Sequence, residues 1–96
     1  MEEINKSEYQ EQTEITVGND PVMLTAVDVV SKLMNQNKIN LKARGNSIPN
    51  AVAVANIITE KMLVGSTKIE KINLDTVNEA GIGNMTSTID IIIKKN

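Results

Sequence analysis

The chain has 96 residues, a formal net charge of −2, no Cys, no His and one aromatic residue, Tyr9. This composition excludes disulfides, thiolate chemistry and any catalytic or metal site that depends on histidine. No apolar run approaches the length of a membrane span, and the N-terminus is acidic where a signal peptide is basic. We therefore expect a cytoplasmic protein with no membrane partner.

The charge is unevenly distributed along the chain. Residues 1–14 hold five Glu and one Lys, whereas the remaining residues hold nine basic and seven acidic side chains. The body is thus mildly basic, well below the basic excess typical of a tight, non-specific nucleic-acid binder. Residues 1–12 also lack apolar periodicity, so we predict a disordered acidic tail over 1–12 and a single domain over 13–96.

The first predicted elements are a strand over 13–17 and a helix after it. Ile15 and Val17 alternate in the strand and are expected to point inward. A turn follows at 18–21, with Asp20 as the helix N-cap and Pro21 at the first helical position. The apolar face predicted for this helix consists of Val22, Met23, Ala26, Val27, Val30, Leu33 and Met34.

The most informative segment is a strand–turn–helix junction over residues 38–52. Apolar and polar residues alternate along the strand up to Gly45, which permits a turn with positive φ. Asn46 or Ser47 can then cap the next helix. Its inward residues are Ile39, Leu41 and Ala43, and its outward residues are Asn40, Lys42 and Arg44. Arg44, the only arginine of the chain, therefore lies where free backbone N–H groups at a helix start favour an anion. We expect a phosphate to bind there.

The second half of the chain predicts one more helix and two strands. The helix covers about 48–62, and its apolar face is Ile48, Ala51, Val52, Ala55, Ile58 and Met62. Val54 and Ile57 widen that face, which indicates either a deeply buried helix or one shared with a partner subunit. A strand over 68–75 follows, with a bulge or late start at Ile69.

A polar connection over 76–85 leads to a last strand over 86–94. Ile89, Ile91 and Ile93 of this strand face the core, whereas Ile92 faces the other way. The order β-α-β-α-β-β predicts an α/β fold, a two-layer sandwich with a mixed four-stranded sheet and two helices on one face.

Three blocks of this sequence resemble the Alba family of small archaeal chromatin proteins. They are Ile15-Thr-Val-Gly-Asn-Asp-Pro-Val-Met23, Ile39-Asn-Leu-Lys-Ala-Arg-Gly-Asn-Ser-Ile48 and Ser87-Thr-Ile-Asp-Ile91. The resemblance implies a homodimer that binds double-stranded DNA or RNA. It also implies phosphate contacts at the loops after the first two strands and a hairpin arm between the last two.

The chain departs from the family pattern at several basic positions. Lysines that usually precede the first-helix Pro are Asn19 and Asp20 here, so a known acetylation switch is not carried over. Asn46 and Asn50 stand at other frequently basic positions. The arm over 77–84 has no basic residue. The candidate nucleic-acid-binding residues are Lys42, Arg44, Gly45, Asn46, Asn50, Asn19, Asn78 and Asn84.

The resemblance and the residues together predict a chromosome-associated, homodimeric protein that binds double-stranded DNA or RNA, weakly for its family. The alternatives are an RNA-binding subunit of a ribonucleoprotein and an assembly module without strong nucleic-acid binding. No phosphate-loop or dinucleotide motif and no pair of carboxylates at catalytic spacing is found, so we expect neither an enzyme nor a cofactor.

Overall fold

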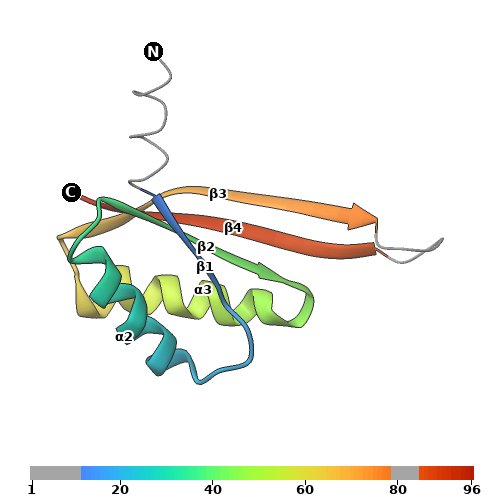
Figure 1. Ribbon diagram of the computed structural model, residues 1–96, viewed down its shortest axis with the longest axis horizontal. Helices are drawn as coiled ribbons and strands as arrows, with labels where there is room; N and C mark the ends of the chain where they lie inside the picture. Colours follow the sequence, from blue (N-terminus) through green and yellow to red (C-terminus); the bar gives the residue numbers. More distant parts are fainter. Residues whose placement is uncertain (1–11, 79–84) are drawn as a thin grey trace, which may run out of the picture.

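A four-stranded sheet carries two helices on one of its faces in the computed structural model, which describes residues 12–78 and 85–96 (Figure 1). The strands are β1 (Gln12–Thr16), β2 (Lys38–Arg44), β3 (Thr67–Asn78) and β4 (Met85–Lys95). The helices are α2 (Val22–Leu33) and α3 (Ile48–Ile57). A 3₁₀ turn (Gly45–Ser47) precedes α3 and a π-helical turn (Ile58–Met62) follows it.

The strand order in the sheet is β1-β2-β4-β3. β1 pairs with β2 in parallel across the α2 crossover, and the other two pairings are antiparallel. The predicted fold class, element order and mixed sheet are therefore confirmed. The face of the sheet without helices is called the open face below.

The core lies between the helices and the other face of the sheet. The predicted alternation in β2 is confirmed, because Ile39, Leu41 and Ala43 are all buried there. The same holds for the odd-numbered isoleucines of β4. Asn40 faces the opposite way yet is also buried, and its Oδ1 has no hydrogen-bond partner among the described residues.

The start and the buried face of α2 differ from the prediction. Pro21, not Asp20, occupies the N-cap position, and no side chain caps the helix. Pro21 is extended, and its carbonyl accepts the hydrogen bond of the Thr25 N–H, so Asp20 lies one residue outside the helix. The buried residues are Ala26, Val29 and Leu33, whereas Met23, Val27 and Met34 are exposed. A helix on a sheet buries only one stripe, and the predicted face was too broad and misplaced.

α3 is the deeply buried helix. Val54 of α3 and Ile58 of the following π-helical turn are completely buried, and Ile57 packs partly against the core. The burial of Val54 therefore supports the first of the two predicted alternatives, a deeply buried helix. Val52 and Met62, placed on the buried face, are partly exposed instead.

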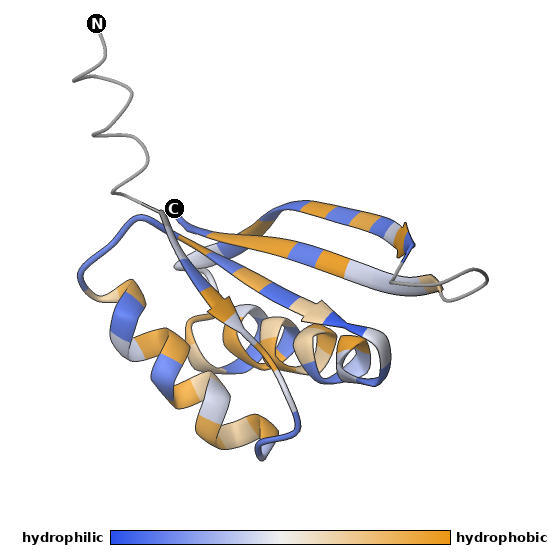
Figure 2. Ribbon diagram, turned by 45° about the vertical axis from the view of Figure 1, so that its right-hand side comes forward, coloured by the Kyte–Doolittle hydropathy of each residue, from blue (hydrophilic) through white to orange (hydrophobic). Residues whose placement is uncertain are grey.

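The β3–β4 hairpin is longer than predicted and extends beyond the helices (Figure 1). The register shift between Ile69 and Lys71 confirms the predicted bulge. Ile72 and Leu74 pair with Ile91 and Ile89 and so point to the helix side of the sheet. No helix covers them, and both are more than half exposed. Hydrophobic and hydrophilic residues alternate along this uncovered strand in Figure 2.

Candidate functional site

The turn after β2 has the geometry that the sequence predicts. Arg44 ends the strand in an extended conformation, with φ −143° and ψ 151°. Gly45 follows with φ +55°, a conformation that L side chains rarely adopt. A Cβ at Gly45 would lie 3.9 Å from Cγ2 of Thr86, which is ordinary contact, so the backbone and not the space requires glycine. Arg44 is thereby turned outward at the start of α3, and it is exposed.

The same turn is joined to the loop that follows β1. The Asn50 side-chain Nδ2 donates a 2.9 Å hydrogen bond to the carbonyl oxygen of Gly18. This bond ties the first turn of α3 to the loop that carries Asn19. Asn19 and Asn46 are both exposed in the joined loops. Asn50 is thus a structural tie, in addition to its predicted place in the binding site.

The helix starts at this end carry neither acids nor side-chain caps. Ser47 occupies the N-cap position of α3 without a capping hydrogen bond, so the capping predicted for Asn46 or Ser47 is not formed. No Asp or Glu lies in the first turn of α2 or of α3. Backbone N–H groups at the start of α2 then lack a side-chain acceptor, and an anion or water can take that place. The start of α3 offers fewer such donors, because Pro49 has no N–H and the Ile48 N–H donates to the Gly45 carbonyl.

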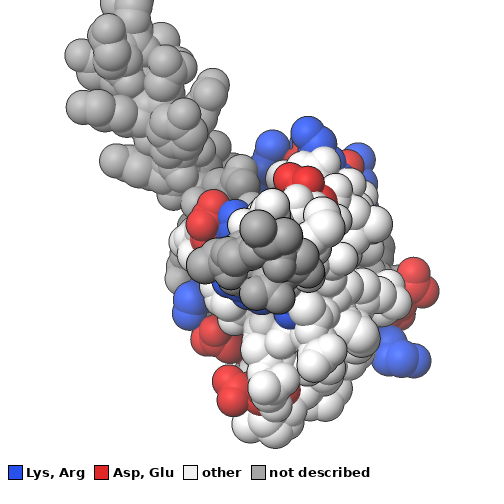
Figure 3. All heavy atoms as spheres, turned by 90° about the vertical axis from the view of Figure 1, so that its right-hand side faces the viewer, with Lys and Arg blue, Asp and Glu red and all other residues white. Residues whose placement is uncertain are grey.

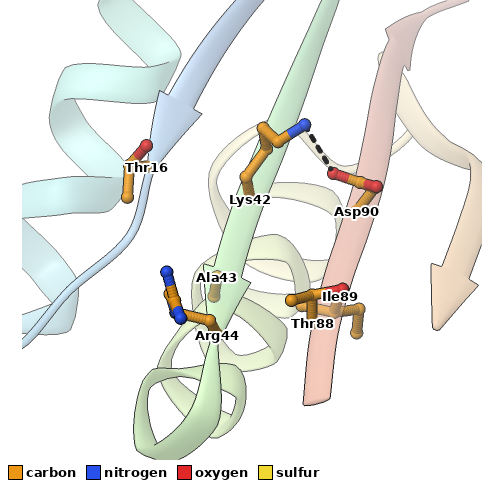
Figure 4. A pocket seen from close by; sticks show the side chains of 7 residues that line it. All are labelled: Thr16, Lys42, Ala43, Arg44, Thr88, Ile89 and Asp90. Atoms are coloured by element: carbon orange, nitrogen blue, oxygen red, sulfur yellow. Dashed lines mark ion pairs between the residues drawn. The ribbon is translucent and has the colours of Figure 1, made fainter. Parts of the chain in front are cut away.

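Lys42 lies on the open face, as predicted, but it is paired. Its Nζ is 3.3 Å from Oδ1 of Asp90 on β4 and 3.8 Å from Oε2 of Glu14 on β1. Figure 4 shows the Lys42 side chain turned toward Asp90, whereas the Arg44 guanidinium lies on the β1 side. A hollow of about 410 Å³ opens here and is lined by Thr16, Lys42, Ala43, Arg44, Thr88, Ile89 and Asp90.

These two carboxylates are site residues that the sequence prediction missed. Glu14 and Asp90 are far from Lys42 in the sequence, and only the strand register brings all three side chains to one face. Asp90 is directly opposite Lys42 in the β2–β4 pairing. The only sequence signal was the even-numbered position of Asp90 among the buried odd-numbered isoleucines. Its presence lowers the positive potential that Lys42 contributes.

The hairpin toward its tip is a second candidate contact, and the described strand there is not basic. Asn78 is exposed at the end of β3 and pairs with Met85, whereas Asn84 lies outside the described residues. Between Ile72 and Asn78 the strand contains no Lys or Arg. Some of the Lys and Arg side chains lie together at the upper edge of Figure 3, on the sheet side of the molecule.

Within residues 12–78 and 85–96, no group of three or more acidic, His or Cys side chains could hold a metal ion. In the same residues no helix is long and apolar enough to cross a membrane.

Comparisons with known proteins agree with the fold. The sequence model of a family described as Alba matches residues 13–76. The DNA/RNA-binding protein Alba of Thermoplasma volcanium is 39% identical over 89 residues, which cover 88% of this chain and 98% of the relative. A relative of the same name from Nitrosopumilus maritimus is 36% identical over 85% of this chain and 90% of its own length.

Two solved structures have the same fold. Alba from Thermoplasma volcanium superposes with a TM-score of 0.75 at 38% identity, over 84% of this chain and 98% of that chain. ALBA1 from Trypanosoma brucei superposes with a TM-score of 0.65 at 19% identity, over 85% and 68%, and supports the fold alone.

Proposed function

This chain belongs to the Alba family, and on that premise we propose that it binds nucleic acid, double-stranded DNA or RNA, as a homodimer. The relatives at 33–39% identity are named DNA/RNA-binding proteins, and those names describe no catalytic activity. We also propose that the protein is cytoplasmic and associated with the chromosome. The binding site consists of the Gly45 turn, the Gly18–Asn19 loop and the start of α3.

The observation that carries this proposal is the outward Arg44 at a glycine turn beside an uncapped helix start. Arg is the side chain best suited to phosphate, because its planar guanidinium can donate two parallel hydrogen bonds. The backbone of the first turn of α3 adds few donors, because Pro49 has no N–H and the Ile48 N–H donates to the Gly45 carbonyl. Arg44 therefore carries most of the phosphate contact in this proposal. Contacts of this kind bind phosphate without reading the base sequence.

We also propose that two copies associate through the uncovered side of the hairpin. Ile72, Leu74 and Met85 share this side and are 51%, 71% and 67% exposed. Ile72 and Leu74 are neighbours on this side of β3, and the polar pair Thr76–Ser87 separates them from Met85. Exposed apolar residues on one side of a hairpin are typical of a protein–protein interface. A second copy of the chain is the occupant we favour, because a thin aliphatic core of this size gains stability from further apolar burial. A dimer doubles the Arg44 site.

The pairing of Lys42 supports weak binding for the family. Asp90 and Glu14 offset its charge, and the described hairpin carries no cation beyond Lys71 toward its tip. Fewer phosphates are then neutralised, which lowers the salt-dependent part of the affinity. The same two observations favour a second candidate, an RNA-binding subunit or assembly module of a ribonucleoprotein.

Replacement of Arg44 by Ala tests the proposed site. We expect weaker binding to all duplex sequences and a log–log salt slope flattened by roughly 1 to 2 units per dimer. Fluorescence anisotropy with labelled duplex DNA and structured RNA measures both quantities. Lys61→Ala is the matched control, because it removes one exposed cation from the π-helical turn. If Arg44→Ala and Lys61→Ala bind DNA and RNA equally well, the site is misplaced.

A further inference from the structure

Three lysines from three neighbouring strands lie side by side at one end of the open face. The register pairs Lys38 of β2 with Lys94 of β4, and Lys94 with Lys68 of β3. Lys38 and Lys94 are out of phase with the buried Ile39 and Ile93, so this lysine row faces away from the helices. Lys71 lies next to the row on β3, opposite Ile92.

Like charges directly opposite each other destabilise a sheet, so an anion bound beside these lysines would relieve their repulsion. Lys38 has one, because its Nζ lies 3.2 Å from Oε1 of Glu70. Across the described part of the chain, no carboxylate forms an ion pair with Lys68, Lys71 or Lys94. Among the described residues, three positive charges at this end therefore have no carboxylate partner. Near Arg44, in contrast, Asp90 and Glu14 offset Lys42.

The row is separate from the proposed site. Lys38 and Arg44 are at opposite ends of β2, about 20 Å apart at 3.3 Å per residue. Lys38 begins β2, but no residue of the row belongs to the Gly45 turn, the Gly18–Asn19 loop or the start of α3.

We propose that the lysine row is a second phosphate-contact surface for the nucleic-acid backbone, an inference that rests on the proposed function. Neighbouring strands are about 4.8 Å apart, so the three ammonium groups span about 10 Å across the sheet. Lys binds phosphate as a flexible point charge, so the row follows a backbone without fixed geometry. No aromatic side chain occurs among the described residues, so the surface offers no platform for stacking bases and contacts the backbone alone.

The test is a pair of charge-matched double variants of the full-length chain. Lys68→Gln with Lys94→Gln neutralises the row and leaves the Lys38–Glu70 pair in place. Lys32→Gln with Lys61→Gln removes the same charge from the helix layer. Anisotropy with labelled duplex DNA at several salt concentrations gives the affinity and the salt slope of each.

We expect the row variant to flatten the log–log slope by about 3 to 4 units per dimer and to weaken binding about tenfold or more at low salt. The control variant keeps a slope close to that of the parent. Equal effects of the two variants would overturn the inference. Unchanged or tighter binding by the row variant would also overturn it. The anions that the row attracts would then be the chain's own acidic residues 2–11, not phosphates.

Two further readouts separate the possible failures. If Arg44→Ala weakens binding and the row variant does not, the proposed function stands and the second surface is wrong. If the parent binds no nucleic acid at low salt, both are wrong. Thermal unfolding checks the fold, and the row variant should melt no lower than the parent because it removes cross-strand repulsion.

Discussion

Replacing Asp90 by Asn should strengthen nucleic-acid binding. The Asp90 carboxylate lies 3.3 Å from Nζ of Lys42 on the open face, within the hollow that also contains Arg44. The amide keeps the shape of the side chain and removes its charge. Lys42 then has only Glu14, at 3.8 Å, as a partner. A phosphate that approaches Arg44 would meet one more available cation and one less repulsive anion.

The size of this effect follows from Coulomb's law. A carboxylate and a phosphate about 8 Å apart repel by about 0.5 kcal/mol in water and about 1 kcal/mol at half that dielectric constant. Removing this repulsion should tighten binding about 2- to 6-fold per protomer at low salt, and less as salt increases. The cost in stability should be small, because an exposed ion pair contributes about 0 to 1 kcal/mol.

Anisotropy with labelled duplex DNA measures the change, and Asp28→Asn is its control. Asp28 is also paired with a lysine, at 3.2 Å from Lys32, but it lies on α2 in the helix layer. Both variants change the net charge equally. If Asp90→Asn binds no more tightly than Asp28→Asn, the open face near Arg44 does not contact phosphate.

Two further predictions concern the turn and the hairpin. Gly45→Ala should cost about 1 to 2 kcal/mol of unfolding free energy in denaturant titrations, because the φ of Gly45 is +55°. Gly18→Ala is the control and should cost less, because Gly18 has no positive φ. Equal losses for the two variants would refute the conformational argument. Leu74→Glu should convert the dimer to a monomer in sedimentation experiments, whereas Asn73→Glu, on the opposite side of the same strand, should not. A parent that sediments as a monomer would contradict the proposed dimer.

Local patterns in the sequence predicted the strand–turn–helix junction well. Apolar and polar residues alternate along β2 with a period of two, and this alternation alone indicates which side chains face the core. The positive φ at Gly45 depends only on the local backbone. These features need no knowledge of distant residues. The bulge at Ile69 was predictable for the same reason, since one residue was out of phase with its strand.

Features that depend on distant residues were not predictable in this way. The pairing of Lys42 with Asp90 follows from the β2–β4 register, which no local pattern determines. The exposure of Leu74 follows from where the helices end relative to the hairpin. Met23 looked like a core residue because helical periodicity identifies an apolar stripe without saying how much of it a sheet covers.

The salt dependence of duplex DNA binding by the full-length protein tests the central claim most directly. Affinity measured by anisotropy between about 25 and 200 mM salt gives the number of phosphates neutralised. Two Arg44 side chains per dimer predict a log–log slope of about −2, and Lys68 and Lys94 of both protomers steepen it to about −5. A slope near zero, or no binding at about 25 mM salt, would contradict phosphate recognition by this fold.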